Sequence, residues 1–386
     1  MLNIKNKLLK TLSLFLSILM TLMAFSSVSV FALSEDDITS PSAVLIEGDS
    51  GKVLYDKNSH DIRACASITK VMTLLLVMEA LDSGKISLDD TVTASAHAAS
   101  MGGSDIWLEE GEQMSVDDMI KATAVASAND AAVALAEFVS GSEDDFVAQM
   151  NDKAKELGMN DTTFKNCNGL DEEGHLTSAY DVALMSKELI KHDKIFDYTS
   201  IWIDNLRGGE TQIVNTNKLL KSYDGITGLK TGTTGDAGSC ISATAERGGM
   251  KLIAVVLGAD TGTNRFKDAA ALLDFGFANY ETSDLKGELT SDSIKVDKGM
   301  VDSVGIECSD IGSIVVQKGE KESVSVEESI EESIEAPFDK GTKVGELTFK
   351  LGDEVIDKKD IVTTQGVDKI SFSSVLSILM GSLLKL

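Results

Sequence analysis

The pattern of hydrophobic and polar positions first predicts a hairpin followed by a buried helix. Two short apolar runs, Ser42 to Ile46 and Val53 to Tyr55, flank the turn-rich segment Glu47 to Lys52, which is typical of a β-hairpin. A helix is predicted to begin near Ser67, and its body from Val71 to Leu81 is almost wholly apolar. A helix that is apolar on every side is expected to be buried on every side.

Further along the chain, helical periodicity gives way to strands. Helices are predicted at about 116–126, 129–140, 143–157, 178–191 and 264–280, and strands at 229–233, 239–245 and 251–258. The Gly248-Gly249 pair predicts the turn between the last two strands. The pattern therefore predicts an α+β fold over residues 33–281, in which a helical cluster packs on an antiparallel sheet built from both ends of the segment.

Beyond residue 281 the chain alternates in short apolar and polar bursts, which predicts a small all-β domain over 282–368. Within it, the glutamate-rich run 327–335 is interpreted as a solvated strand or loop face rather than a recognition motif. Residues 369–386 form an amphipathic pattern, with one helical face listed as Phe372, Val375, Leu376, Leu379, Leu383 and Leu386. Such a helix can anchor the protein on a membrane surface, or it can dock on the protein's own core.

The first 32 residues have the pattern of an export signal. Lys5, Lys7 and Lys10 precede an apolar run from Leu12 to about Phe25, and small residues then lead to Ala32, where cleavage is predicted. A retained membrane helix is the alternative, but the apolar run is short. We therefore expect an exported, extracytoplasmic protein, held peripherally on the outer face of the cell membrane by its C-terminal helix.

Charge and cysteine content exclude some functions. The net charge is −27, with 62 acidic against 35 basic residues, so a nucleic-acid partner is not expected. The four cysteines (Cys65, Cys167, Cys240 and Cys308) have no framework spacing, and either two disulfides or buried free thiols fit them, with thiols favoured. Neither a metal site nor a cofactor is predicted, because no metal-ligand spacing occurs.

The predicted buried helix opens with Ser67-Ile68-Thr69-Lys70. The serine and the lysine are three residues apart and therefore project on the same helical face. A Ser-x-x-Lys pattern alone is weak evidence, since Ser382 to Lys385 also matches it, and a serine at a helix start is often only an N-cap. A helix cap leaves unexplained why a lysine should be buried in an apolar helix, because an unpaired buried ammonium is costly.

Two further motifs supply the other groups that acyl transfer needs. They are Ser127-Ala128-Asn129 between two helices and Lys230-Thr231-Gly232 on a predicted strand. Ser67 is the predicted nucleophile and Lys70 its base, which must be neutral and therefore needs a pKa near 7, at a cost of ~4 kcal/mol. Ser127 would relay protons to the leaving amine. Asn129 would hold the substrate amide, Lys230 and Thr231 a carboxylate, and the backbone N–H groups of Ser67 and Thr233 an oxyanion.

In this order, the three motifs match the penicilloyl-serine transferase set, and the chain resembles the D-alanyl-D-alanine carboxypeptidases, the low-molecular-mass penicillin-binding proteins. The resemblance covers about 40–280 and includes further matching stretches: Ala66–Thr73, Ser127–Ala132, Met150-Asn151, Asn168–Leu170, Gly228–Thr234 and Ala237-Gly238. It implies a penicillin-binding or β-lactamase-like transpeptidase domain. It also implies hydrolysis of the terminal D-Ala of peptidoglycan stem pentapeptides through an acyl-enzyme at Ser67, with β-lactams acylating the same serine.

The sequence departs from the family pattern at Cys65, where members often have proline, and at Thr227, where many have aspartate. Arg265, expected in a turn after the last strand, is assigned either an assisting role in carboxylate binding or a surface role. A β-lactamase of the same fold is the nearest rival function, with Glu172 or Glu173 as its deacylating base. A non-catalytic wall-binding module is the other alternative.

Overall fold

The computed structural model describes residues 33–283, 289–308, 314–372 and Leu376. The predicted signal segment, most of the predicted anchor helix (373–375 and 377–386) and the second Ser-x-x-Lys pattern lie outside these residues. The expected helix does not begin at Lys369, because Lys369 forms a β-bridge with Gly299 and the Ile370 N–H donates to Lys298 O. In the part of the chain that is described, no helix is long and apolar enough to cross a membrane.

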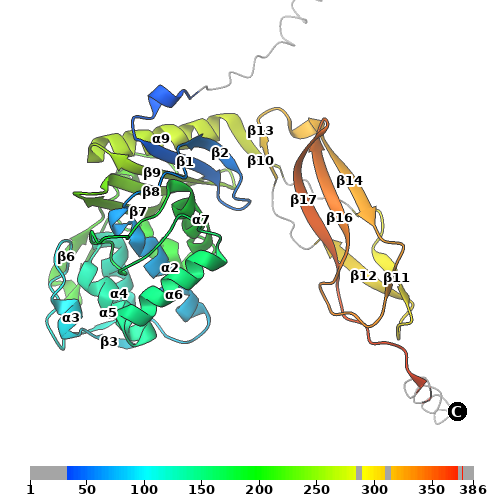
Figure 1. Ribbon diagram of the computed structural model, residues 1–386, viewed down its shortest axis with the longest axis horizontal. Helices are drawn as coiled ribbons and strands as arrows, with labels where there is room; N and C mark the ends of the chain where they lie inside the picture. Colours follow the sequence, from blue (N-terminus) through cyan, green and yellow to red (C-terminus); the bar gives the residue numbers. More distant parts are fainter. Residues whose placement is uncertain (1–32, 284–288, 309–313, 373–375, 377–386) are drawn as a thin grey trace, which may run out of the picture. The chain divides into compact units, whose positions relative to one another are not determined.

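An antiparallel five-stranded sheet forms the centre of the fold, as predicted, and includes the hairpin near its start (Figure 1). The strand order is β2-β1-β9-β8-β7, so strands from both ends of the segment pair with one another. This order leaves β7, which contains the Lys-Thr-Gly motif, at an edge of the sheet. The strands are β1 (Ser42–Glu47), β2 (Val53–Lys57), β7 (Ile226–Thr234), β8 (Gly238–Arg247) and β9 (Met250–Ala259).

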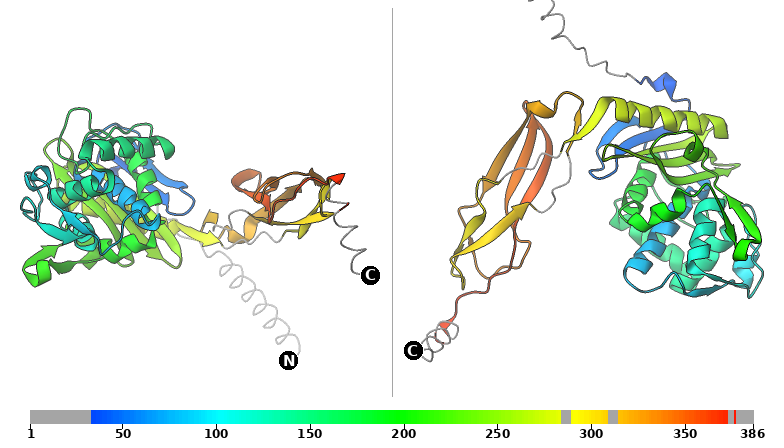
Figure 2. Two further views of the ribbon diagram at one scale, coloured as in Figure 1. Left: turned by 90° about the horizontal axis from the view of Figure 1, so that it is seen from below. Right: turned by 180° about the vertical axis from the view of Figure 1, so that it is seen from behind.

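Both faces of this sheet are covered. Alternate residues of a strand point to opposite faces, and on β1 Leu45 packs with α9 (Gly262–Asn279), whereas Val44 and Ile46 pack with the helical cluster. The views of Figures 1 and 2 agree on this three-layer arrangement. Double coverage explains why β1 and β9 are nearly continuous apolar runs.

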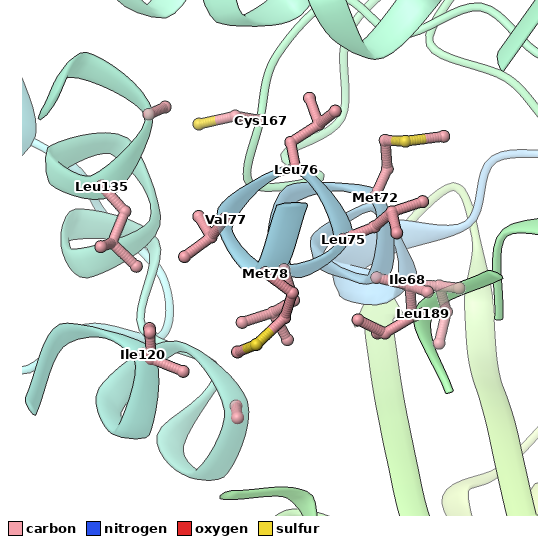
Figure 3. Packing of buried hydrophobic residues seen from close by; sticks show 14 of the residues in the cluster. Ile68, Met72, Leu75, Leu76, Val77, Met78, Ile120, Leu135, Cys167 and Leu189 are labelled. Carbon is pink, nitrogen blue, oxygen red and sulfur yellow. The ribbon is translucent and has the colours of Figure 1, made fainter. Parts of the chain in front are cut away.

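The helical cluster surrounds α2 (Lys70–Asp82), whose residues from Lys70 to Met78 are all buried, as its uniformly apolar sequence predicts. Figure 3 shows side chains leaving α2 in several directions, among them Val77 toward Leu135. The surrounding helices are α3 (Ala96–Ala99), α4 (Val116–Lys121), α5 (Asn129–Ser140), α6 (Glu143–Glu156), α7 (Ala179–Leu189) and α8 (Phe196–Thr199). Two small ribbons join β3 (Thr91–Thr93) to β4 (Gln113–Ser115) and β5 (Ile203–Leu206) to β6 (Thr211–Val214).

Two predicted helices differ from the expected form at their ends, and both differences lie at the motifs. The helix expected from Ser67 begins as a tight 3-10 turn, η2 (Ala66–Thr69), before α2. The helix expected over 116–126 ends at Lys121 and continues as a π-helical turn, Ala122–Ala126. Helical periodicity does not distinguish these tighter and wider turns from an α-helix, although such turns are frequent at functional sites.

The later part of the chain is all β, as predicted, and has its own hydrophobic core. Its six-stranded sheet has the order β14-β16-β17-β12-β11-β15, and the glutamate-rich run lies mostly exposed on β14 and β15. A separate ribbon pairs β10 (Tyr280–Ser283) with β13 (Ile314–Gln317). The sheet strands are β11 (Ser293–Asp297), β12 (Ser303–Cys308), β14 (Val324–Ile330), β15 (Ser333–Glu335), β16 (Lys343–Leu351) and β17 (Glu354–Thr363).

The four cysteines, all of which the structure describes, form no disulfide. Cys65, Cys167 and Cys240 are buried, whereas Cys308 is only partly buried. The interpretation as thiols is therefore confirmed, and the expected burial holds for three of the four.

Candidate active site

Ser67 and Lys70 meet at the start of α2. The 3-10 turn η2 leaves Ser67 partly exposed, whereas Lys70, the first residue of α2, has no exposed surface. The Lys70 amine donates a hydrogen bond to the Ser67 hydroxyl over 3.0 Å. A partly exposed hydroxyl, the candidate nucleophile, thus contacts a buried amine, the candidate base.

The buried amine of Lys70 has two further acceptors. Its Nζ lies 2.5 Å from Asn129 Oδ1 and 2.6 Å from the backbone oxygen of Asn168. Burial lowers the pKa of Lys70 to about 7, although the nearby Cys167 and Asp130 oppose the shift. Three hydrogen bonds fix the position of the amine, and burial makes its neutral form accessible near neutral pH.

Ser127 and Lys230 form a second hydroxyl–amine pair. The π-helical turn ends at Ser127, whose backbone lies in the left-handed region with φ +61°. Lys230, on the edge strand β7 and 1% exposed, donates a hydrogen bond of 2.8 Å to Ser127 Oγ and one of 2.9 Å to the Thr231 oxygen. Burial, together with the charges of Lys70 and Arg265, holds the pKa of Lys230 well below its usual range.

The third motif brings the edge strand against the nucleophile. A Cβ atom added to Gly232 would lie 2.9 Å from both Cys65 O and Ser67 N. Only glycine permits this approach of backbone to backbone, because real Cβ contacts are almost never so short. Thr233, the next residue of the same edge strand, is exposed beside it.

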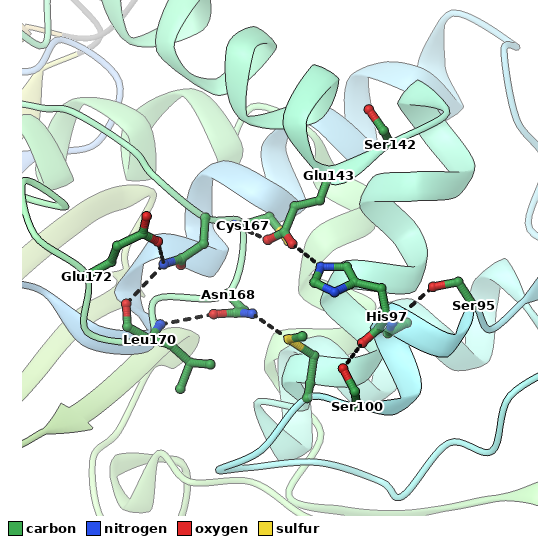
Figure 4. Close-up of polar contacts among 12 residues, drawn as sticks. Ser95, His97, Ser100, Ser142, Glu143, Cys167, Asn168, Leu170 and Glu172 are labelled. Atoms are coloured by element: carbon green, nitrogen blue, oxygen red, sulfur yellow. Dashed lines mark hydrogen bonds and ion pairs between the residues drawn. The ribbon is translucent and has the colours of Figure 1, made fainter.

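The loop that carries Asn168 closes the site from the other side. Figure 4 shows the contacts that hold it: Asn168 accepts a hydrogen bond from Leu170 N at 3.0 Å, and Glu143 accepts one from Cys167 N at 3.0 Å. The rival bases Glu172 and Glu173 are exposed on this loop, and a Glu172 oxygen accepts a bond from Asn166.

All the predicted site residues gather here, but some contacts differ from expectation. Asn129 binds Lys70 and, through Nδ2, the Gly102 oxygen at 2.7 Å, so its amide serves the protein's own groups. Thr231 Oγ1 pairs with Thr216 Oγ1 at 2.5 Å.

Arg265 lies on α9 and is 9% exposed, so the expected turn and the alternative surface role are both wrong. Its Nη1 donates to Gly232 O and Thr233 Oγ1, each at 2.8 Å.

Two groups that support the site, the backbone carbonyl of Asn168 and the carboxylate of Asp130, were not predicted from the sequence. Asp130 is buried and accepts hydrogen bonds of 3.0 Å from the N–H groups of Ile106 and Leu108, which fastens a loop next to Asn129. A backbone acceptor has no sequence signal, whereas an aspartate beside a motif residue does. Among the described residues, no three His, Cys, Asp or Glu side chains cluster so as to hold a metal ion.

A partly exposed hydroxyl bound to a buried amine, beside an edge strand, is suited to nucleophilic acyl transfer. Comparison with known proteins identifies the family. The model of the D-alanyl-D-alanine carboxypeptidase family, peptidase S11, matches residues 29–261. The chain belongs to this family. The prediction of a serine-type carboxypeptidase that hydrolyses D-Ala–D-Ala is thereby confirmed.

Two similar proteins each match most of the length of this carboxypeptidase. It is 48% identical to D-alanyl-D-alanine carboxypeptidase DacF of Bacillus subtilis over 88% of this chain and 89% of DacF. Penicillin-binding protein 5 of Haemophilus influenzae superposes with a TM-score of 0.77, at 30% identity over 88% of this chain and all of that one. A second family model, the C-terminal domain of penicillin-binding protein 5, matches residues 284–369. The predicted fold class is confirmed by these matches, except for the terminal helix.

Proposed function

We propose that Ser67 is the nucleophile of the carboxypeptidase reaction and Lys70 its general base. Neutral Lys70 takes the proton of the Ser67 hydroxyl as Oγ attacks the carbonyl carbon of the penultimate D-Ala in a peptidoglycan stem pentapeptide. The observation that carries this assignment is the 3.0 Å contact between Ser67 Oγ and an amine with a pKa of about 7. A base with a pKa near the working pH is the most effective at moving a proton.

Ser127 and Lys230 act on the leaving group. The 2.8 Å bond between them allows Ser127 to pass a proton to the amine of the departing D-Ala. Lys230 and Thr231 receive the substrate's terminal carboxylate. Because burial depresses the pKa of Lys230, an incoming carboxylate raises that pKa again and favours the charged form. Asn129 has a second amide N–H beyond the one that binds Gly102 O, and this N–H donates to the bound peptide while Oδ1 accepts from Lys70.

The backbone N–H groups of Ser67 and Thr233 stabilise the oxyanion of the tetrahedral intermediate. The close approach that Gly232 permits between β7 and Ser67 N supports this assignment, since it brings the two backbones together. Water then hydrolyses the acyl-enzyme. β-Lactams acylate the same serine; a solved relative, penicillin-binding protein D2 of Listeria monocytogenes, contains bound ampicillin and is 36% identical over 62% of this chain and 97% of that one, with a TM-score of 0.57.

A pair of measurements tests the catalytic assignment. Fluorescent penicillin should label the wild type and leave Ser67→Ala unlabelled, and the wild type should release D-Ala from diacetyl-Lys-D-Ala-D-Ala. If Ser67→Ala were labelled as strongly as the wild type, Ser67 would not be the nucleophile. Rapid nitrocefin hydrolysis without D-Ala release would instead identify a β-lactamase.

The organisation and location of the chain follow the same proposal. Residues 1–32 are an export signal, 33–281 the catalytic domain, 282–368 the β domain and 369–386 a membrane-anchor helix. The basic, apolar and amphipathic patterns support this division, and the two family matches, 29–261 and 284–369, fall mainly within the proposed catalytic and β domains. Deletion of 370–386 should release the protein from membranes while D-Ala release continues; persistent membrane association would contradict the anchor.

A further inference from the structure

Ala66, the residue that precedes Ser67, has an unfavourable backbone conformation. Ala66 has φ +51°, a left-handed backbone that costs an alanine roughly 1–2 kcal/mol. Gly169 packs so closely against the Ala66–Ser67 peptide that a Cβ there would lie 2.0 Å from Ala66 O. Contacts around the Ala66–Ser67 peptide must therefore hold it in place.

One such contact runs through two buried side chains outside the motifs. Thr69, on the same turn, donates its hydroxyl proton to Ala66 O over 2.9 Å, and His175 Nε2 lies 2.7 Å from the same Thr69 oxygen. Cys65 Sγ also lies 3.4 Å from this oxygen. Thr69 has no exposed surface, and His175 is 4% exposed.

The direction of the hydrogen bonds follows from the far side of the imidazole ring. His175 Nδ1 accepts a hydrogen bond of 3.0 Å from the backbone N–H of Lys165, so the proton of a neutral ring is assigned to Nε2. Burial lowers the pKa of His175 to about 4, which keeps the ring neutral near neutral pH. The chain of donation therefore runs from His175 to Thr69 and from Thr69 to the Ala66 carbonyl.

The backbone around His175 is itself well fixed. The next residue, Leu176, exchanges two backbone hydrogen bonds with Thr163, and Thr177 exchanges two with Arg63. The ring also packs edge-on against Phe164, with centroids 5.8 Å apart. His175 is thus a well-held donor that orients the hydroxyl of Thr69.

We propose that His175 is a positioning residue that, through Thr69, aims the Ser67 N–H at the oxyanion. In a planar trans peptide, C=O and N–H point in opposite directions, so an anchor on Ala66 O fixes the direction of Ser67 N–H. Without the anchor, the plane of this peptide can turn about the single bonds on either side of it, and the N–H donor leaves its place. This inference rests on the proposed function, because it needs Ser67 N–H to be an oxyanion donor.

Two substitutions of the same histidine separate positioning from mere packing. In His175→Gln, the side-chain Nε2 can still reach Thr69, whereas in His175→Asn the side-chain oxygen can still accept from Lys165 but Thr69 loses its donor. Thr69→Val removes the hydroxyl at nearly constant volume. Thr177→Val is the matched control, since it removes a buried hydroxyl contact of 2.7 Å, to Thr162, two residues from His175.

The full-length variants are compared by acylation with fluorescent penicillin, by kcat and KM for D-Ala release, and by melting temperature. Loss of a well-aimed oxyanion donor reduces kcat by up to about 10²–10³-fold, so we expect Thr69→Val and His175→Asn to lower acylation and kcat by about 10-fold or more with little change in KM. His175→Gln should keep most of the activity, and Thr177→Val should lose stability without losing rate.

Equal losses in His175→Gln and His175→Asn, or a wild-type rate in Thr69→Val, would overturn the inference. If Thr69→Val fails to fold, the comparison of the two histidine variants and of Thr69→Ser, which keeps the hydroxyl, still decides. If only the positioning role of His175 and Thr69 is wrong, fluorescent penicillin still labels the wild type at Ser67. If the proposed function itself is wrong, this Ser67-dependent labelling is absent.

Discussion

The catalytic region and the C-terminal β region place their polar groups differently. Over residues 33–279 the structure buries many polar and charged side chains, including Lys70, Lys230 and Asp130. In the described residues from 289 onward, Thr363 is the one buried polar side chain, and the ion pairs lie between partly or largely exposed groups. Burial of a charge is costly, so a region that accepts this cost repeatedly is organised around chemistry, whereas the β region is organised around packing.

The comparison is tested most severely by exchanging one lysine in each region for methionine. Lys70→Met removes the proposed base, and general-base catalysis contributes about 10²–10⁴-fold, so acylation by fluorescent penicillin should fall by about that factor. Lys350→Met, which removes an exposed pair with Glu327, should acylate at the wild-type rate. A fast Lys70→Met enzyme would mean that another group takes the Ser67 proton.

Two glycines with the same backbone conformation give the next contrast. Gly169 and Gly341 have φ +85° and +84°, but a Cβ on Gly169 would meet Ala66 O at 2.0 Å, whereas nothing lies within 4 Å of one on Gly341. Gly341→Ala should therefore cost only the left-handed penalty of roughly 1–2 kcal/mol. Gly169→Ala should lose more free energy of unfolding and also much of the acylation rate, as measured by urea unfolding and penicillin labelling. Equal costs would show that conformation, not contact, requires Gly169.

The pH dependence should report the buried lysine. With the pKa of Lys70 lowered by burial to about 7, the acylation rate should fall about tenfold per pH unit below 7 and level off above it. A rate that is constant between pH 5 and 8 would contradict this.

The stability of the fold should also depend on pH through Lys70. The unfolded lysine, with an ordinary pKa of 10.5, binds a proton between pH 7 and 10.5 that the folded one does not, so raising the pH through this window should stabilise the fold. Lys70→Met should weaken this rise in the free energy of unfolding, measured by urea unfolding across the same pH range.

The smallest effect is expected on the β sheet itself. Lys350 and Glu327 lie 2.5 Å apart with side chains 27% and 62% exposed. A double-mutant cycle measured by urea unfolding should give a coupling of at most about 1 kcal/mol, reduced by salt. A larger coupling that salt does not reduce would mean that ion pairs contribute substantially to the stability of the β region.

Much of the site could be predicted because its side chains occur in short motifs on elements with clear periodicity. The uniformly apolar run after Lys70 predicts a buried helix, and burial in turn predicts a depressed lysine pKa; the structure has both. Arg265 was placed wrongly because its buried position depends on the packing of α9 against β7 and β8, not on its neighbours in sequence. The anchor helix stays a prediction, since most of it lies outside the described residues.

The sequence by itself determined the order and chemistry of the motifs, the α+β class and the buried character of α2, because these depend on residue type and local periodicity. Only the tertiary structure decided the left-handed turns at Ala66 and Ser127, the approach of Gly169 and Gly232 to Ser67, and the contact of His175 with Thr69. These contacts join residues that are far apart in the chain: 106 positions separate Thr69 from His175, and 165 separate Ser67 from Gly232. The backbone strain and the buried polar groups at these positions cost free energy, and tertiary packing offsets that cost. Such packing cannot be read from the local sequence pattern.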